Sequence, residues 1–304
     1  MRADPNTRAR SKARAVSVTA FAKINLTLHV KGVRADGYHE LRTRFQSLAI
    51  HDTLVFRERP GPFKIECDDP AIPTDRANLV WRAADRVWEA AGRRGEVSGV
   101  AVTIEKGIPV EAGLGGGSTD AAAALRALTG LWRVRIAPAR LQRIAASLGA
   151  DVPFFLIGGT AVGVNRGDKL IPERGARASV VLVQPAFGVS TAAAYGWWDA
   201  DHEAGLDVSS RDEWRNDLER AVARRHPEIA EIAAALRQRG ASYAAMSGSG
   251  SAVFGLFESP SRASAAARTL SSISGTPLKT LVTRTTNRTE YTRGSRPRFV
   301  RGAV

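Results

Sequence analysis

Apolar and polar residues alternate along the first long segment of the chain. From Val16 to Val30 every even-numbered position is apolar, whereas most odd-numbered positions are polar. A period of two is typical of a β-strand with one buried face, so we expect such a strand over 16–30. The same period places four polar side chains together on the other face: Lys23, Asn25, Thr27 and His29. This face is either a solvated strand surface or a rigid element that presents functional groups.

Strand-like and helix-like patterns alternate along the rest of the chain. The turn signal Asp36-Gly37 precedes stretches that predict another pair of strands up to residue 56. Helical spacing predicts helices over 78–91, over about 118–129 with Ser118 or Thr119 as cap, over 138–148 and over 228–238. Strand character recurs over 100–110, 152–164, 178–184 and 243–257. The alternation predicts an α/β fold.

The length of the chain predicts two domains. The 304 residues include 44% hydrophobic and 24% charged residues, enough for two moderate cores. We place the boundary near 179, which gives an N-terminal domain over 16–178 and a C-terminal domain over 179–288. The ends, 1–15 and 289–304, are basic and poor in large apolar residues, so we expect flexible tails there.

The net charge of +14 raises the question of nucleic-acid binding. Its distribution argues against this function, because residues 1–14 carry +4 and residues 284–304 carry +5. Charge gathered at the two ends favours a weak attraction to polyanions. We therefore expect no nucleic-acid partner, and an RNA-binding protein remains the alternative from a different functional class.

Cysteine content and hydropathy limit the other classes. Cys67 is the only cysteine, which excludes an internal disulfide, a thiolate zinc site and an iron–sulfur cluster within one chain. No apolar run approaches the ~20 residues that cross a bilayer, and no apolar signal-peptide core follows the basic start. We expect a soluble cytoplasmic protein without a membrane partner. The sequence leaves open whether it is a monomer or a homodimer.

A glycine-rich loop over 113–117 is the first candidate for chemistry. Four glycines precede a hydroxyl residue and an alanine-rich helix, so backbone N–H groups and the helix dipole can meet a polyanion there. The loop is not a Walker A motif, because no lysine follows its last glycine, and Ser118 replaces the final glycine of GxGxxG. We expect phosphate binding; the alternative is a flexible turn. The residues assigned to this phosphate-binding segment are Pro109, Val110, Glu111, Ala112, Gly113, Leu114, Gly115, Gly116, Gly117, Ser118 and Thr119.

Asp151 is the second candidate. It lies between the helix over 138–148 and an apolar run, and such surroundings favour the neutral acid unless a cation is near. A neighbouring Lys23 would keep the carboxylate ionised, as a general base requires, and would stabilise a developing alkoxide. An aspartate that only caps a helix is an equal alternative. A second glycine turn within 246–257 either closes over a substrate or simply joins two strands.

Taken together, these segments resemble the superfamily of galactokinase, homoserine kinase, mevalonate kinase and phosphomevalonate kinase, whose signature includes a PxxxGLGGSS-like loop. The matching segments are PVEAGLGGGSTDAA from Pro109, AKINLTLHV from Ala22, DGYHELRTRFQSL from Asp36, LGADVPFFL from Leu148 and MSGSGSAVFGLF from Met246. As a set they look like the branch that phosphorylates 4-diphosphocytidyl-2-C-methyl-D-erythritol. The match spans nearly everything between the tails. Thr119 replaces a common second serine and keeps the hydroxyl.

The resemblance implies a two-domain fold and a set of site residues. An N-terminal ATP-binding domain, of the kind also seen in a ribosomal protein, and a smaller C-terminal α/β domain would hold the substrate between them. Lys23 and Asp151 would form the catalytic pair. The remaining implied contacts are Tyr38 as a stacking ring, His39 as a hydrogen-bonding partner of cytosine, Asn25 beside the lysine, Phe187 as a second stacking face and Lys106 as a nucleotide contact.

The implied reaction transfers the γ-phosphate of ATP to the 2-hydroxyl of this small-molecule substrate, in the non-mevalonate route to isoprenoids. Mg²⁺ would bridge the phosphates mostly through oxygen and water, with Ser118 as the one candidate protein ligand. Another member of the superfamily, such as a homoserine or mevalonate kinase, is the alternative enzyme. The segment DGYHEL, which begins at Asp36, argues against it.

Overall fold

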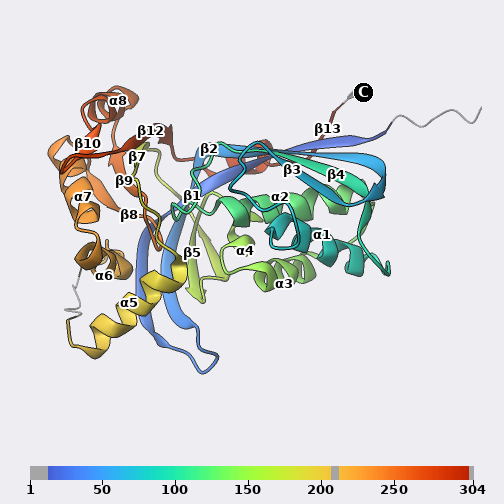
Figure 1. Ribbon diagram of the computed structural model, residues 1–304, viewed down its shortest axis with the longest axis horizontal. Helices are drawn as coiled ribbons and strands as arrows, with labels where there is room; N and C mark the ends of the chain where they lie inside the picture. Colours follow the sequence, from blue (N-terminus) through green and yellow to red (C-terminus); the bar gives the residue numbers. More distant parts are fainter. Residues whose placement is uncertain (1–12, 207–211, 301–304) are drawn as a thin grey trace, which may run out of the picture.

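The computed structural model describes residues 13–206 and 212–300, which form two large β-sheets with their covering helices and one separate two-stranded hairpin (Figure 1). The first sheet has seven strands, in the path β13-β1-β2-β4-β3, with β5 joined to β2 and β6 joined to β5. These strands are β1 (Ala15–Val33), β2 (His39–Pro62), β3 (Lys64–Cys67), β4 (Ser98–Glu105), β5 (Thr160–Asn165), β6 (Lys169–Glu173) and β13 (Arg298–Val300). Four helices cover one face of this sheet: α1 (Leu79–Ala90), α2 (Gly116–Leu131), α3 (Pro138–Leu148) and α4 (Val152–Phe155).

The second sheet has four strands in the order β12-β7-β9-β8. They are β7 (Ser179–Gln184), β8 (Tyr243–Met246), β9 (Val253–Phe257) and β12 (Lys279–Arg284), with a small hairpin of β10 (Ser272–Ile273) and β11 (Thr276–Pro277). The helices of this part are α5 (Thr191–Glu203), α6 (Asp217–Arg225), α7 (Glu228–Gln238) and α8 (Pro260–Arg268). The mixed α/β architecture with two parts agrees with the expected fold. No helix among the described residues is long and apolar enough to cross a membrane.

The first strand explains how the two parts are joined. The apolar positions Val16, Val18 and Ala20 pack under the helices of the first sheet. Further along the strand, Ala22, Ile24 and Leu26 belong to a different cluster, which includes residues of β7 and β9. The opposite face of β1 is buried as well, because Lys23 is 3% and Asn25 also 3% exposed. The solvated-surface interpretation of this face is therefore wrong.

Helix α2 starts earlier than its sequence suggests. Gly115 occupies the N-cap position with φ of 75°, and no side chain caps the helix, so neither Ser118 nor Thr119 has that role. Glycine adopts this left-handed conformation without the steric cost that a Cβ brings. The alanines that follow are buried, which lets the helix pack closely on the sheet and on α1. The first N–H groups of α2 consequently point out of the glycine loop without intrahelical acceptors.

Two other stretches differ from the expected elements. The segment expected to form a pair of strands after Gly37 is one long strand, β2, which pairs with β1, β4 and β5 along its length. The apolar run over 152–164 is divided between α4 and β5. Pro153 lies in the first turn of α4, where its missing N–H costs no hydrogen bond.

The C-terminal segment 289–300 is not a flexible tail. It forms most of helix α9 (Arg288–Gly294), which begins with a capping box between Asn287 and Glu290, and then strand β13 beside β1. Tyr291 is 2% exposed, and its hydroxyl donates to Phe155 O at 2.6 Å. One buried aromatic ring, one capped helix and the pairing of β13 with β1 therefore order a segment that is otherwise basic. Residues 1–12 and 301–304 lie outside the described residues, so a flexible end there stays a prediction.

Candidate active site

A cavity of about 990 Å³ lies where the two parts of the structure meet. Its wall includes β1, β2, the glycine loop, the start of α4, the start of α5 and the turn between β8 and β9. Most of the residues singled out in the sequence line it: Lys23, Asn25, Tyr38, His39, Lys106, Asp151 and the loop from Pro109 to Ser118. Thr119 is 1% exposed and lies beneath this wall rather than in it.

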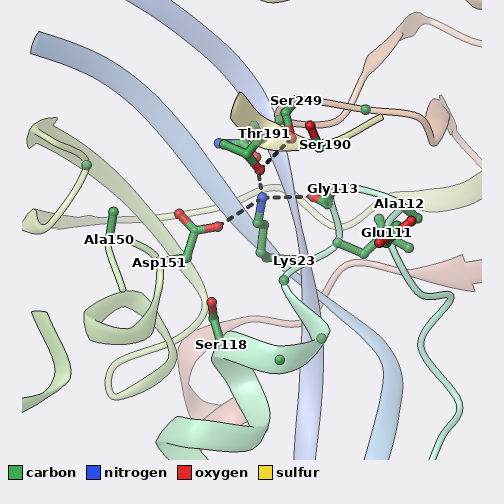
Figure 2. A pocket seen from close by; sticks show the side chains of 18 of the residues that line it. Lys23, Glu111, Ala112, Gly113, Ser118, Ala150, Asp151, Ser190, Thr191 and Ser249 are labelled. Carbon is green, nitrogen blue, oxygen red and sulfur yellow. Dashed lines mark hydrogen bonds and ion pairs between the residues drawn. The ribbon is translucent and has the colours of Figure 1, made fainter. Parts of the chain in front are cut away.

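Lys23 and Asp151 form an ion pair inside the cavity (Figure 2). Lys23 Nζ lies 3.3 Å from Asp151 Oδ2, and it donates to Asn25 Oδ1 at 2.6 Å and to Gly113 O at 2.8 Å. The lysine side chain is 4% exposed, whereas the aspartate is 32% exposed and so remains open to the cavity. Asp151 precedes α4 but makes no side-chain capping hydrogen bond, so the capping interpretation does not hold.

The glycine loop is held close to Lys23 and to the Phe155 ring. At Gly115, an added Cβ would lie 2.7 Å from the Phe155 ring and 3.2 Å from Lys23 Cε. At Gly113, with φ of 70°, it would lie 2.1 Å from the carbonyl oxygen of Ser247. These contacts explain why the loop needs glycine even before a ligand enters. The loop brings the N-terminus of α2 to the cavity, where its N–H groups and dipole favour phosphate.

The second glycine turn, Ser247–Ser251, packs against the first glycine loop. Ser247 Oγ donates to Gly113 O at 3.0 Å and accepts the N–H of Asn25 at 3.3 Å. Ala252 N donates to Ala112 O at 3.3 Å. The turn joins two strands, β8 and β9, and Gly248, Ser249 and Gly250 also line the cavity. The turn therefore joins two strands, as one interpretation had it, and it also borders the cavity. That it closes over a substrate stays a prediction.

Lys106 is committed to two carboxylates that the sequence analysis did not single out. Its Nζ pairs with Asp52 Oδ2 and, at 3.1 Å, with Asp120 Oδ2. Burial alone would lower the pKa of Lys106, but Asp120 and Asp52 together raise it. Burial raises the pKa of Asp120 to about 8, against the effect of Lys106. Asp52 also accepts the N–H groups of Gly107 and Ile108 at 2.7 and 2.8 Å, so the cluster anchors the chain before the loop.

The far end of the cavity is aromatic. His39 Nε2 lies 2.8 Å from Asp199 Oδ1, and its ring stacks on Tyr195 with centroids 4.6 Å apart. Tyr38 is 56% exposed. A second ring beside these two residues is thus supplied by Tyr195 of α5. Thr191 and Tyr195 are four residues apart on α5, so both lie on one helix face toward the cavity, but no pattern in the sequence singles out this face.

The structure does not bring Phe187 to this cavity. Its ring stacks on His226 with centroids 4.2 Å apart, and it borders a separate cavity of about 320 Å³. Phe187 follows β7 directly, and the chain must turn before α5 begins. The expectation that Phe187 forms a second stacking face beside Tyr38 and His39 is therefore wrong in this structure.

Oxygen ligands suitable for Mg²⁺ occur at the cavity, but the part of the chain that the structure describes forms no dedicated cage. Within residues 13–206 and 212–300, no group of three or more His, Cys, Asp or Glu side chains could hold a metal ion. Ser118 at the start of α2 and Asp151 both line the cavity. A Mg²⁺ ion that keeps most of its water and binds phosphate oxygens fits this arrangement.

Comparisons with known proteins agree with this geometry. Family models for the N-terminal and C-terminal domains of GHMP kinases match residues 78–159 and 204–274. The 4-diphosphocytidyl-2-C-methyl-D-erythritol kinase of Moorella thermoacetica is 41% identical over 289 residues, which cover 89% of this chain and 99% of that protein. The kinase of the same name from Chlorobium luteolum is 40% identical and covers 80% of this chain and 89% of its own length.

Solved structures give the same result. A crystal structure of 4-(cytidine 5'-diphospho)-2C-methyl-D-erythritol kinase aligns with a TM-score of 0.71 and 36% identity, over 89% of this chain and 100% of that chain. Homoserine kinase from Cytophaga hutchinsonii aligns with a TM-score of 0.66 over 98% of this chain and 100% of that chain, but at 18% identity it supports the fold alone. The chain therefore belongs to the GHMP kinases and, among them, to the 4-diphosphocytidyl-2-C-methyl-D-erythritol kinase family.

Proposed function

We propose that this enzyme transfers the γ-phosphate of ATP to the 2-hydroxyl of 4-diphosphocytidyl-2-C-methyl-D-erythritol. The observation that carries the proposal is the ion pair between Lys23 and Asp151. It lies between a glycine loop suited to phosphate and a group of aromatic side chains suited to a base. One cavity thus offers places for a nucleotide donor, a reacting hydroxyl and a cytidine, which is the combination that this reaction requires.

Asp151 acts as the general base. Its carboxylate accepts the proton of the 2-hydroxyl as that oxygen attacks the γ-phosphorus, and the bond from phosphorus to ADP breaks. The Lys23 ammonium, 3.3 Å from the Asp151 carboxylate, stabilises the charge that develops on the attacking oxygen. Because Lys23 Nζ also donates to Asn25 and Gly113, its ammonium is fixed in place before the substrate arrives.

The phosphates of ATP bind at the start of α2. The N–H groups of this first turn and the helix dipole stabilise negative charge, and the close packing of Gly113 and Gly115 keeps the loop open to a phosphate. Mg²⁺ would be held by phosphate oxygens, water and the Ser118 hydroxyl, and it would neutralise charge on the transferring phosphate. Lys106, held by Asp52 and Asp120, positions the chain that leads into the loop.

Tyr38, His39 and Tyr195 bind the cytosine. When His39 donates its Nε2–H to Asp199, its Nδ1 carries a lone pair, which can accept a hydrogen bond from the exocyclic amino group of cytosine. Tyr38 offers an exposed ring for stacking, and Tyr195 holds the imidazole from its other side. Since Cys67 is a free thiol and the donor is ATP, we place the enzyme in the cytoplasm.

Turnover of ATP with three acceptors compared side by side tests the proposed function. The cytidylated methylerythritol should be phosphorylated far faster than homoserine or mevalonate at equal concentration. Addition of EDTA should stop the reaction and Mg²⁺ should restore it. Faster turnover of homoserine or mevalonate would contradict the proposed substrate while leaving the kinase fold and the ATP site intact.

A further inference from the structure

Three long cationic side chains line the cavity among the described residues: Lys23, Lys106 and Arg166. The Lys23 ammonium is shared among Asp151, Asn25 and Gly113, and the Lys106 ammonium lies between Asp52 and Asp120. Arg166 differs from both. Its closest carboxylate oxygen, Asp168 Oδ2, is 3.7 Å from Nη2, and its guanidinium donates no hydrogen bond within residues 13–206 and 212–300. Among the described residues that line the cavity, Arg166 is therefore the cation whose N–H groups remain available to a ligand.

The backbone that carries Arg166 is fixed. Arg166 lies in the turn between β5 and β6, where Asn165 has φ of 68° and donates through Nδ2 to Asp168 Oδ1 at 2.9 Å. Arg34, in the turn between β1 and β2, donates to Asn165 Oδ1 and also to Asp36 and Glu40. These contacts join the two turns at the rim of the cavity, so the base of the Arg166 side chain is held while its guanidinium is not.

The guanidinium lies beside the cytidine end of the cavity. Arg166 Cζ is 4.7 Å from the centroid of the Tyr38 ring, a distance at which cation and ring attract each other. Tyr38 and Arg166 come from different hairpins, yet both line the cavity. A cytosine that stacks near Tyr38 would place the first atoms of its ribose and phosphates next to this side chain.

We propose that Arg166 binds the diphosphate group of the cytidylated substrate, an interaction that rests on the proposed function. This substrate carries its two phosphates between the cytidine, near Tyr38, and the reacting hydroxyl, near Lys23 and Asp151. Lys23 is committed to the reaction and Lys106 to its carboxylates, so neither is available to this second phosphate group. A guanidinium can donate two parallel hydrogen bonds to phosphate oxygens, and the Tyr38 ring keeps its charge close to them. Arg166 thus distinguishes a cytidine diphosphate derivative from uncharged acceptors.

The competing explanation is that Arg166 only supports the Tyr38 ring. Cytidine and cytidine 5'-diphosphate separate the two roles, because both carry the base and only the second carries the diphosphate. Their affinities are measured by calorimetry with a non-hydrolysable ATP analogue present at saturation, so that neither competes for the ATP site. The variants are Arg166→Gln, Arg166→Lys and the control Lys169→Gln, which removes an exposed positive charge from the start of the neighbouring strand β6.

Arg166→Gln should weaken the binding of cytidine diphosphate about tenfold, because loss of one charge-assisted hydrogen bond usually lowers affinity by this factor. The binding of cytidine should change less than about twofold. Arg166→Lys should recover part of the loss, and Lys169→Gln should match the wild type. The KM for ATP should not change in any variant. Equal weakening of both ligands would show that Arg166 supports Tyr38, and unchanged binding of both would show that it contacts neither; each result would overturn the proposal. If the wild type fails to phosphorylate the cytidylated substrate, the proposed function fails, and the calorimetry still decides whether Arg166 binds a diphosphate.

Discussion

Replacement of Asp151 by asparagine isolates the proton transfer from the rest of the reaction. The amide is nearly isosteric with the carboxylate but cannot take the hydroxyl proton, so we expect Asp151→Asn to keep both substrates bound and lose turnover. Loss of a general base is worth about two to four decades in rate, which corresponds to roughly 3–5.5 kcal/mol in the barrier. Because Asp151 is 32% exposed and caps no helix, the variant should melt close to the wild type.

Lys23→Met should give a comparable loss of rate, but with a different effect on stability. The lysine ammonium is the donor to Asn25 Oδ1 at 2.6 Å, and Asn25 is buried. A buried acceptor left without a donor costs about 1–3 kcal/mol. The other acceptor, Gly113 O, keeps the hydrogen bond from Ser247 Oγ at 3.0 Å. We therefore expect a lower melting temperature for Lys23→Met than for Asp151→Asn, although their rates are similar.

The double variant shows whether the two residues act together. If each single change costs about three decades and the residues act as a unit, the double variant should also lose about three decades, whereas independent roles would multiply to about six. The measurement is single-turnover phosphoryl transfer at saturating ATP and substrate, with thermal melting as the check on folding. Near wild-type rates for Asp151→Asn would refute the general-base role. Fully multiplicative losses would mean that Lys23 serves the phosphates independently of Asp151.

Three further predictions follow from particular contacts. Gly116→Val should weaken ATP binding with the fold intact, which calorimetry measures. Gly115→Val should also lower the melting temperature in a thermal melt, because Gly115 has φ of 75° and an added Cβ would lie 2.7 Å from the Phe155 ring. His39→Ala should raise the KM for the cytidylated substrate by about one to two decades and Tyr38→Phe by less, with the KM for ATP unchanged in steady-state assays. Burial, aided by Arg215, lowers the pKa of His29 below its usual 6.5. As the pH falls below 6.5, the unfolded chain therefore binds a proton at this histidine before the folded protein does, and the free energy of unfolding decreases. Urea melts at pH 7.5 and 5.5 should show a smaller decrease in the free energy of unfolding for His29→Gln than for the wild type.

Much of the fold was predictable because local patterns agree with the final packing. The alternation over 16–30 became β1, and the helix expected over 138–148 has those bounds in the structure. What the alternation could not reveal is that both faces of β1 are covered near Lys23. The apolar face packs against β7 and β9, and on the polar face Lys23 meets Gly113 and Asp151. All of these partners lie at least 90 positions later in the chain, so period two alone implied a free polar face.

The C-terminal segment was misjudged for a similar reason. Six arginines over 284–304 suggested a solvated end, yet α9 is anchored by Tyr291, whose ring lies 5.4 Å from Phe21 and whose hydroxyl binds Phe155 O. The average composition of a segment does not show that one of its rings is buried. From composition alone, deletion of 290–304 should leave the fold intact, but the deletion removes Tyr291 and its contacts with Phe21 and Phe155.

The site could be predicted in part. Lys23 and Asp151 could be singled out because local patterns place them. Lys23 lies on the polar face of an alternating strand, and Asp151 lies between a helix and an apolar run. Tyr195 was missed because its role depends on how α5 lies beside the long hairpin of β1 and β2, as Figure 1 shows, and no local pattern encodes that placement. The pairing of Lys106 with Asp52 and Asp120 likewise joins three separate segments.

The second glycine turn makes the first glycine loop depend on the C-terminal part of the chain. Ser247 links Asn25, Lys23's hydrogen-bond partner, to Gly113 of the loop, although Ser247 and Asn25 are 222 positions apart. Asn216 fixes the turn in its own place, because its Nδ2 donates to Met246 O at 2.9 Å and to Gly248 O at 2.7 Å. A shift of the second sheet relative to the first would therefore change the acceptors around the Lys23 ammonium directly. Lys23 belongs to the first sheet, but the geometry of its hydrogen bonds is set by both sheets.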